Sequence, residues 1–316
     1  MLLLEDRGLL KNKKIVITGG AGFIGSNLAR TLCEENEVIV IDNLLTGHYE
    51  NISGVADRIR FVRDDVNNLD MLMSEFQSVD YVLHQAALPS VQRSVDDPVT
   101  TNRNNIDGML NVLVAARDCG VKRVVFASSS AIYGDVSEMP LREIAPPKPL
   151  RPYAVTKLAG EHYCRVFHEV YRLETVSLRY FNVFGPGQDS SSEYAAVIPK
   201  FIKAVKTGGQ PVVYGDGKQT RDFVFVADVV RANILACEAP KAAGKAFNIA
   251  TGKGISLNEL LDTLRKITGR EIEPIYTDPR HGDIKDSIAD ITRARKTLSY
   301  EPHVEVEDGI GIMWSC

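Results

Sequence analysis

The chain has 316 residues, a formal net charge of −4 at pH 7, and positive and negative side chains scattered along its length. This balance argues against a nucleic-acid-binding protein and against a protein held on a membrane surface. The length is sufficient for two lobes with a substantial core. The five cysteines are spread singly, which is typical of reduced thiols in a cytoplasm and not of a zinc site or a disulfide framework.

The first strand and the turn after it are typical of a dinucleotide-binding site. Residues 1–12 open with an apolar run too short for a signal peptide or membrane span, and we expect a surface arm there. Residues 14–18 form a β-branched run typical of a buried parallel strand. Gly19, Gly22 and Gly25 follow, before an apolar helix pattern. Glycines at these places permit a tight turn, a close pyrophosphate and close packing of the helix on the strand.

An acidic residue at the end of the second strand favours NAD over NADP. Residues 38–41 form that strand, and Asp42 lies about 20 residues beyond the central glycine, where it accepts a hydrogen bond from a ribose 2′-hydroxyl and repels a 2′-phosphate. We expect the same cofactor site to include Phe23, Ile24 and Asn43.

The alternation of strands and helices continues and predicts further cofactor contacts. Strands are expected at 60–63, 81–84 and 123–127, and helices at 69–76 and 102–119. Ligands of parallel sheets bind beyond the carboxyl ends of the strands. Asp65 is either a cofactor contact or a helix cap, and Asn105 is either a cofactor contact or a solvated polar residue. The other residues expected near the cofactor from these segments are Val66, Ala86, Ala87 and Ser128.

A tyrosine and a lysine lie four residues apart on the predicted helix 153–171, which follows a proline-rich loop. Tyr153 and Lys157 therefore share one face of the helix, although such a pair also occurs by chance on ordinary amphipathic helices. An ammonium and a cationic cofactor ring together lower a tyrosine pKa from about 10 towards neutrality. Ser129 and Ser130 follow a central strand, either as substrate contacts or as an ordinary serine-rich turn.

Taken together, these segments resemble the extended short-chain dehydrogenase/reductases and, within them, the UDP-sugar 4-epimerases. The resemblance covers nearly the whole chain through TGGAGFIGS, HQAALPSVQRSVDDP, FASSSAIYGD, PYAVTK, LRYFNVFGPGQ, RDFVFVADV and PRHGD. It implies an α/β fold with a Rossmann-type doubly wound parallel sheet and a smaller α/β C-terminal lobe. The NAD-binding domain is expected at 13–180, with some later segments returning to it, and the UDP-sugar-binding lobe mainly at 181–316.

The resemblance also implies a reaction at C4 of a sugar. Tyr153 would be the base, Lys157 its partner and a ligand of the nicotinamide ribose, and Ser129 a hydrogen-bond partner of the C4 oxygen, with Tyr180 beside the cofactor. NAD would take the C4 hydride and return it to the other face of a 4-keto sugar. Related dehydratases and decarboxylases have carboxylates at positions where this chain has Ser130 and Ala131. The proton-transfer group that those two reactions need is therefore missing, which argues against them.

The UDP-sugar site is assigned by the same resemblance. Arg221 and Arg280 would bind the diphosphate because guanidinium groups fit paired phosphate oxygens, although either could instead form a surface ion pair. Asp283 would bind ribose hydroxyls. Epimerases restricted to UDP-glucose have a tyrosine where this chain has Ser287, so an N-acetyl group is expected to fit. The remaining substrate contacts expected are Ser129, Ser130, Asn182, Val197, Val212 and Tyr214.

The expected function is therefore interconversion of UDP-N-acetylglucosamine and UDP-N-acetylgalactosamine, with UDP-glucose and UDP-galactose also accepted. The alternatives are a UDP-glucuronate 4-epimerase, a related NAD-dependent reductase of nucleotide sugars that releases NADH, and a catalytically silent NAD-sensing regulator. A homodimer is expected through helices 102–119 and 153–171, unless packing within the chain buries their apolar outer faces.

Overall fold

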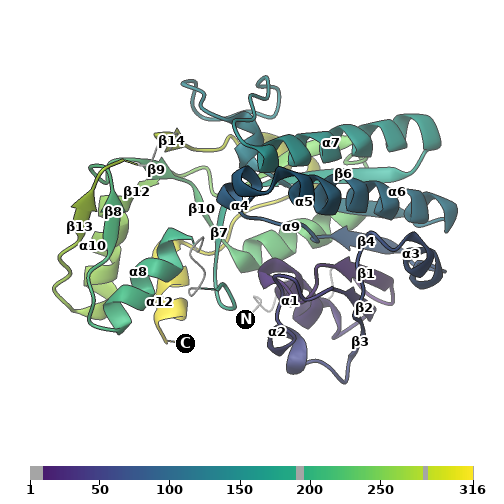
Figure 1. The fold of residues 1–316 in the computed structure, drawn as a ribbon, viewed down its shortest axis with the longest axis horizontal. Coiled ribbons are helices and arrows are strands. Elements are labelled where there is room, and N and C mark those ends of the chain that lie inside the picture. The colour runs from purple at the N-terminus through teal and green to yellow at the C-terminus, as the bar shows by residue number, and fades with distance from the viewer. Residues whose placement is uncertain (1–9, 190–195, 280–283, 316) are drawn as a thin grey trace.

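The computed structural model describes residues 10–189, 196–279 and 284–315, which form a larger and a smaller lobe (Figure 1). The larger lobe contains a parallel seven-stranded sheet in the order β11-β6-β5-β4-β1-β2-β3. Its strands are β1 (Lys14–Thr18), β2 (Glu37–Ile41), β3 (Ile59–Val62), β4 (Tyr81–His84), β5 (Arg123–Ser129), β6 (Glu174–Tyr180) and β11 (Lys245–Ile249). The predicted doubly wound sheet is confirmed.

Helices cover both faces of this sheet, which explains why its strands are almost continuously apolar. Two separate clusters of buried side chains, one on each face, join the strands to different helices. One face carries α3 (Leu69–Glu75), α6 (Gly108–Asp118) and α7 (Pro152–Tyr171). The other carries α1 (Phe23–Leu32), α9 (Val226–Glu238) and α11 (Thr292–Leu298), and the short helix α2 (Glu50–Ser53) contacts α1.

The helix predicted at 102–119 begins earlier than expected and is interrupted. The structure has α4 (Val91–Asp96), α5 (Pro98–Asn102), a π-helical turn at Arg103–Asp107, and then α6. Asp97 caps α5 by accepting a hydrogen bond from the Thr100 amide, and Pro98 occupies the first turn. Aspartate followed by proline is a recognised start of a helix, so the earlier boundary was present in the sequence.

The expectation of a surface arm at the N-terminus is wrong for Leu10, whereas Lys11 and Asn12 are exposed. The Leu10 side chain is only 5% exposed and belongs to the core on the α1 face of the sheet. The Asn36 amide also donates a hydrogen bond to the Leu10 carbonyl. Residues 1–9 lie outside the described residues.

The smaller lobe is built from short strands and three helices around its own apolar cluster. The paired strands are β7 (Asn182–Phe184) with β10 (Phe223–Phe225), β8 (Val212–Tyr214) with β13 (Ile275–Thr277), and β9 (Thr220–Arg221) with both β12 (Ile255–Ser256) and β14 (Asp286–Ser287). The helices are α8 (Val197–Lys206), α10 (Leu257–Thr268) and α12 (Val306–Ser315). Because β11 pairs with β6, part of the chain after residue 181 lies in the larger lobe.

Across the described parts of the chain, no helix has the length and apolar character needed to cross a membrane. Within these same ranges, no cluster of three or more histidine, cysteine, aspartate or glutamate side chains could hold a metal ion. Cys33, Cys119, Cys164 and Cys237 are free thiols.

Candidate active site

The glycine-rich turn between β1 and α1 has no room for side chains at two of its positions. Gly19 has φ of +68°, and a Cβ atom there would lie 2.6 Å from the Ala86 amide nitrogen. A Cβ atom on Gly25 would collide with the Gly19 carbonyl oxygen. A Cβ atom on Gly22 would approach only that same oxygen, at 3.2 Å. The turn therefore needs glycine at 19 and 25 to form, while the Gly22 backbone stays open to a ligand.

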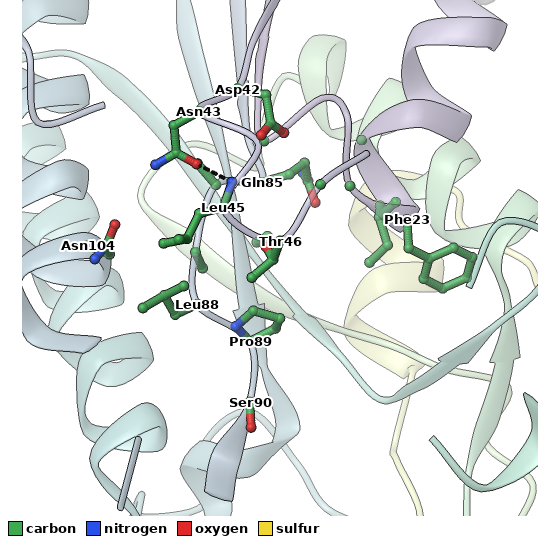
Figure 2. A pocket seen from close by; sticks show the side chains of 18 of the residues that line it. Phe23, Asp42, Asn43, Leu45, Thr46, Gln85, Leu88, Pro89, Ser90 and Asn104 are labelled. Carbon is green, nitrogen blue, oxygen red and sulfur yellow. Dashed lines mark hydrogen bonds between the residues drawn. The ribbon is translucent and has the colours of Figure 1, made fainter. Parts of the chain in front are cut away.

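A cavity of about 610 Å³ lies beside this turn, at the carboxyl ends of the central strands. It occupies the point between β1 and β4 where the strand order reverses, which is where ligands of such sheets bind. Figure 2 shows Asp42 and Asn43 at one end of the cavity and Ser90 at the other. The predicted cofactor residues that line it are Gly19, Gly22, Phe23, Ile24, Gly25, Asp42, Asn43, Val66, Ala86, Ala87, Ser128, Tyr153, Lys157 and Tyr180.

Asp42 joins the glycine-rich turn to the loop after β2. Its carboxylate accepts hydrogen bonds from the amides of Ala21, at 2.9 Å, and Leu44, at 2.8 Å. Burial raises the pKa of Asp42, against the lowering effect of these two hydrogen bonds. The carboxylate lines the cavity, so it places an acceptor where a ribose hydroxyl would bind and repels an added phosphate.

Two predicted cofactor residues lie behind the cavity wall. Burial raises the pKa of Asp65, but hydrogen bonds from Asn67 and Asn43 outweigh this and lower it below its usual value. The Asn105 side chain is 3% exposed and bonds to Leu88 and Thr156. The structure therefore does not support either residue as a direct cofactor contact.

Their neighbours Asp64 and Asn104 line the cavity instead. The shift from Asn105 to Asn104 was not visible in the sequence, because the π-helical turn at Arg103–Asp107 changes which helical residues face the sheet. Further lining residues were missed, although five of them fall in the HQAALPSVQRSVDDP segment that carried part of the resemblance. The missed residues include Leu45, Thr46, Gly47, His48, Gln85, Leu88, Pro89, Ser90 and Arg93.

Tyr153, Lys157 and Ser129 come together as the sequence predicted. The Lys157 Nζ atom lies 5.7 Å from the centre of the Tyr153 ring and donates a hydrogen bond to the Ala127 carbonyl at 2.8 Å. The Ser129 side chain forms a hydrogen bond with that of Tyr153. At the start of α7, the buried Ser94 hydroxyl accepts a hydrogen bond from the Tyr153 amide at 3.1 Å. Ser129 therefore contacts the phenol, while Ser94 holds the Tyr153 backbone at the start of α7.

Burial controls the pKa values of both members of the pair. Burial raises the pKa of Tyr153 to about 12, although the hydrogen bond from Ser129 lowers it. Burial lowers the pKa of Lys157 to about 7. Each shift has the same cause, because a charge removed from water is disfavoured whatever its sign. The lysine alone therefore does not bring the phenol towards neutrality, and an additional positive charge is needed at this position.

A second cavity of about 480 Å³ lies in the smaller lobe, and Ala196 lines both cavities. Predicted substrate contacts line it from four different elements: Asn182, Val197, Val212, Tyr214 and Arg221. The sequence did not identify Lys200, Phe201, Gln219 or Phe223, which also line it.

The remaining predicted substrate residues have different positions. Ser287 is 8% exposed and pairs with Arg221 across β14 and β9, which places it next to a lining residue. Ser129 and Ser130 lie at the end of β5 and the start of the turn after it. Arg280 and Asp283 lie outside the described residues, so their assignment to the substrate stays a prediction.

Comparison with known proteins gives consistent matches over almost the whole chain. A UDP-glucose 4-epimerase of Mycolicibacterium smegmatis is 38% identical over 303 residues, covering 94% of this chain and 96% of the relative. A UDP-N-acetylglucosamine 4-epimerase from Methanobrevibacter ruminantium, solved in complex with UDP-N-acetylmuramic acid, is 42% identical with a TM-score of 0.93, covering 97% of this chain and 99% of that one.

Another similar structure contains both a dinucleotide and a nucleotide sugar. It is a UDP-glucuronic acid 4-epimerase from Bacillus cereus in complex with UDP-glucuronic acid and NAD, 33% identical, with a TM-score of 0.88, covering 96% of this chain and 98% of that one.

Residues 15–250 match the sequence family described as the NAD dependent epimerase/dehydratase family. The glycine turn without space for side chains and the carboxylate at Asp42 fit a dinucleotide in the first cavity. Tyr153 and Lys157, which line the same cavity, together with Ser129 beside Tyr153, fit chemistry on a hydroxyl group. This chain belongs to the NAD dependent epimerase/dehydratase family.

Proposed function

We propose that the protein is a UDP-sugar 4-epimerase that keeps NAD bound through each turnover. The observation that carries the proposal is that Tyr153 and Lys157 line the dinucleotide cavity, with Ser129 hydrogen-bonded to Tyr153. The second cavity adjoins the first and offers Arg221 for a diphosphate and Tyr214 for a base. A nucleotide sugar that occupies the second cavity would present its hexose to the catalytic residues.

The chain's own residues account for the movement of protons. Tyr153 takes the proton from the C4 hydroxyl in the first half of the reaction and returns it in the second. The Ser129 hydroxyl donates a hydrogen bond to the C4 oxygen, and Lys157 stabilises the phenolate. Bound NAD supplies the hydride acceptor and donor chemistry. The cavity walls shield the 4-keto sugar from water while the hexose turns.

N-acetylated hexoses are the preferred substrates in this proposal. Ser287 is a small side chain next to Arg221, at a position where restricted epimerases have tyrosine, and it leaves space for an acetamido group. The similar structure from Methanobrevibacter ruminantium was solved with an N-acetylated UDP-sugar, which supports this choice. UDP-glucose and UDP-galactose fit the same space, because a larger pocket discriminates only weakly against smaller ligands. UDP-glucuronate is the second candidate, favoured by the similarity to the Bacillus cereus enzyme.

Substituting tyrosine for Ser287 should lower kcat/KM for the N-acetylated pair by roughly 10- to 200-fold. The added ring would occupy the space of the acetamido group, whereas UDP-glucose turnover should fall less than threefold or so. Both rates are measured with each UDP-sugar as substrate. Ser287→Ala is the matched control and should retain both activities. If Ser287→Tyr turns over the N-acetylated pair unchanged, Ser287 does not control substrate size.

Product analysis of purified protein without added coenzyme tests the proposed function itself. UDP-N-acetylglucosamine, UDP-glucose and UDP-glucuronate are each incubated with the protein, and 4-epimers are separated by chromatography. An epimerase produces them without net absorbance change at the nicotinamide band, whereas a reductase converts coenzyme in proportion to product. Absence of any 4-epimer with all three sugars would contradict the proposal and favour a regulator.

We further propose that the protein is a homodimer in the cytoplasm. Val99 on α5 is 77% exposed, and Val166 and Val170 on α7 are 41% and 63% exposed. Helices α5 and α7 contact one another, so their valines can form one apolar surface of the kind that helices of two subunits bury. The free thiols fit a reducing compartment.

Replacing Val170 by glutamate should convert the dimer to a monomer, because a charge would be buried at the helix contact. Sedimentation velocity measures the molecular mass of both proteins. The control is Ile275→Glu, at an exposed isoleucine of the smaller lobe. Val212 on the neighbouring strand is also exposed, but it lines the second cavity and is therefore not used. A wild-type monomer would refute the proposed dimer.

A further inference from the structure

A buried ion pair joins the helix that carries Tyr153 to the strand beside the one that carries Ser129. Arg179 on β6 and Glu161 on α7 have side chains that are 8% and 9% exposed. Two parallel hydrogen bonds connect them, from Nε to Oε1 at 2.9 Å and from Nη2 to Oε2 at 2.7 Å. This two-point geometry fixes the orientation of both groups, unlike a single contact between mobile chains.

Each member of the ion pair also contacts a residue close to Ser129 in the chain, Glu161 before it and Arg179 after it. The Ser128 hydroxyl donates a hydrogen bond to Glu161 Oε1 at 2.5 Å. Arg179 Nη1 donates to the Tyr133 hydroxyl at 2.8 Å, and the guanidinium lies 5.0 Å from the centre of that ring. Tyr133 ends the short helical turn that begins directly after Ser129.

The contacts continue from Tyr133 towards the edge of the sheet. Its hydroxyl donates to Asn248 Oδ1 on β11 at 2.6 Å, and the Asn248 amide donates to the Leu141 and Asp290 carbonyls. Arg179 Nη1 also donates to the Glu143 carbonyl. The residues before and after Ser129 are therefore both hydrogen-bonded to the Glu161–Arg179 ion pair. Glu161 lies on α7, one helical turn after Lys157.

We propose that Glu161 and Arg179 are positioning residues that hold Ser129 at hydrogen-bonding distance from Tyr153. Neither residue lines the dinucleotide cavity or the second cavity, so they act through the serine segment and not by touching substrate. The kinetic part of this inference rests on the proposed function, whereas the structural part does not.

A second arginine–glutamate ion pair that also involves β6 provides a control. Arg123 on β5 and Glu174 on β6 face one another at the ends of these strands opposite Ser129, where Arg123 Nε and Nη2 both donate to Glu174 Oε2, at 2.9 and 2.6 Å. The Arg123 side chain is 5% exposed and that of Glu174 is 46% exposed. This pair has the same ionic chemistry, but it joins two strands and lies at the end of the sheet away from the site.

The kinetic test compares Glu161→Gln with Glu174→Gln. Glutamine keeps the size of the side chain and can still accept the Ser128 hydrogen bond, but it loses the charge that fixes the guanidinium. We expect kcat of Glu161→Gln to fall by roughly 10- to 100-fold, with KM for the UDP-sugar and the NAD content unchanged, because a small displacement of a catalytic group slows the chemical step. Glu174→Gln should retain kcat. An equal loss in both variants, or a change confined to KM, would refute the proposal.

A structural measurement separates this inference from the proposed function. Crystal structures of the wild type and Glu161→Gln report the Ser129 to Tyr153 distance whether or not either protein is active, and we expect the hydrogen bond to be lost in the variant. Retention of that bond would overturn the inference, while an inactive wild type would overturn only the function. If Glu161→Gln does not fold, Tyr133→Phe removes a single hydroxyl from the same network, and the same two measurements decide with it.

Discussion

Replacing Tyr153 by phenylalanine should lower kcat by roughly 10²- to 10⁴-fold, the range that general acid–base catalysis usually contributes. The hydroxyl is the only group of Tyr153 that this change removes, so the ring keeps its place near Lys157. Because the phenol both accepts and returns the C4 proton, its loss affects the two halves of the reaction. The KM for the UDP-sugar should change little, since binding relies mainly on the second cavity.

The control for this prediction is Tyr163→Phe, ten residues further along α7, whose ring packs against the core on the α7 face of the sheet. Its kcat should equal that of the wild type. Thermal unfolding and the NAD content of both variants are measured to exclude a loss of folded protein. If Tyr153→Phe keeps more than about a tenth of the wild-type kcat, Tyr153 is not the acid and base of the reaction.

The predicted site residues that lie at the cavity were identified from short segments. Gly19, Gly22 and Gly25 are constrained by a turn of seven residues, and Asp42 follows directly from the end of a strand. Tyr153 and Lys157 share a helix face by helical periodicity alone. Each of these predictions required only local geometry and the rule that ligands bind at the carboxyl ends of parallel strands.

What the sequence left open or missed depends on contacts between side chains that the sequence does not specify. Asp65 was expected to be either a cofactor contact or a helix cap, and its carboxylate accepts hydrogen bonds from Asn43 and Asn67. Leu10 was placed in a surface arm, but it packs in the core. Glu161 and Arg179 could not be identified from the sequence, because their proposed role depends on hydrogen bonds to Ser128 and Tyr133. The pattern of a single sequence does not show which side chains form such bonds.

The pKa values illustrate the same limit at the catalytic centre. The sequence placed Lys157 beside Tyr153 and predicted that its ammonium and a cationic cofactor ring together lower the tyrosine pKa. Burial, which depends on the whole fold, raises the pKa of Tyr153 and lowers that of Lys157 in the chain itself. How much of the lowering the cofactor would have to supply could therefore not be read from the sequence.

Replacing Lys157 by methionine should abolish measurable epimerisation and also remove a pH dependence of stability. The folded-state pKa of Lys157 is about 7, below its ordinary value of 10.5, because burial disfavours the ammonium. Between those values the unfolded chain binds more protons than the folded one, so the wild-type free energy of unfolding rises with pH. Below about pH 7 both states are protonated, and the full cost of the buried charge, up to about 5 kcal/mol, is present.

The difference in unfolding free energy between Lys157→Met and the wild type therefore changes in a defined direction. The unfolding free energy of the variant should fall relative to that of the wild type by up to about 1.4 kcal/mol for each pH unit from pH 7 to 10, because the wild-type lysine loses its charge in the folded state. Urea denaturation of the NAD-free proteins measures this difference. The exposed Lys241→Met should show no such slope. A parallel pH dependence in Lys157→Met and the wild type would mean that Lys157 stays charged in the folded protein, and the phenolate would then need no further cation.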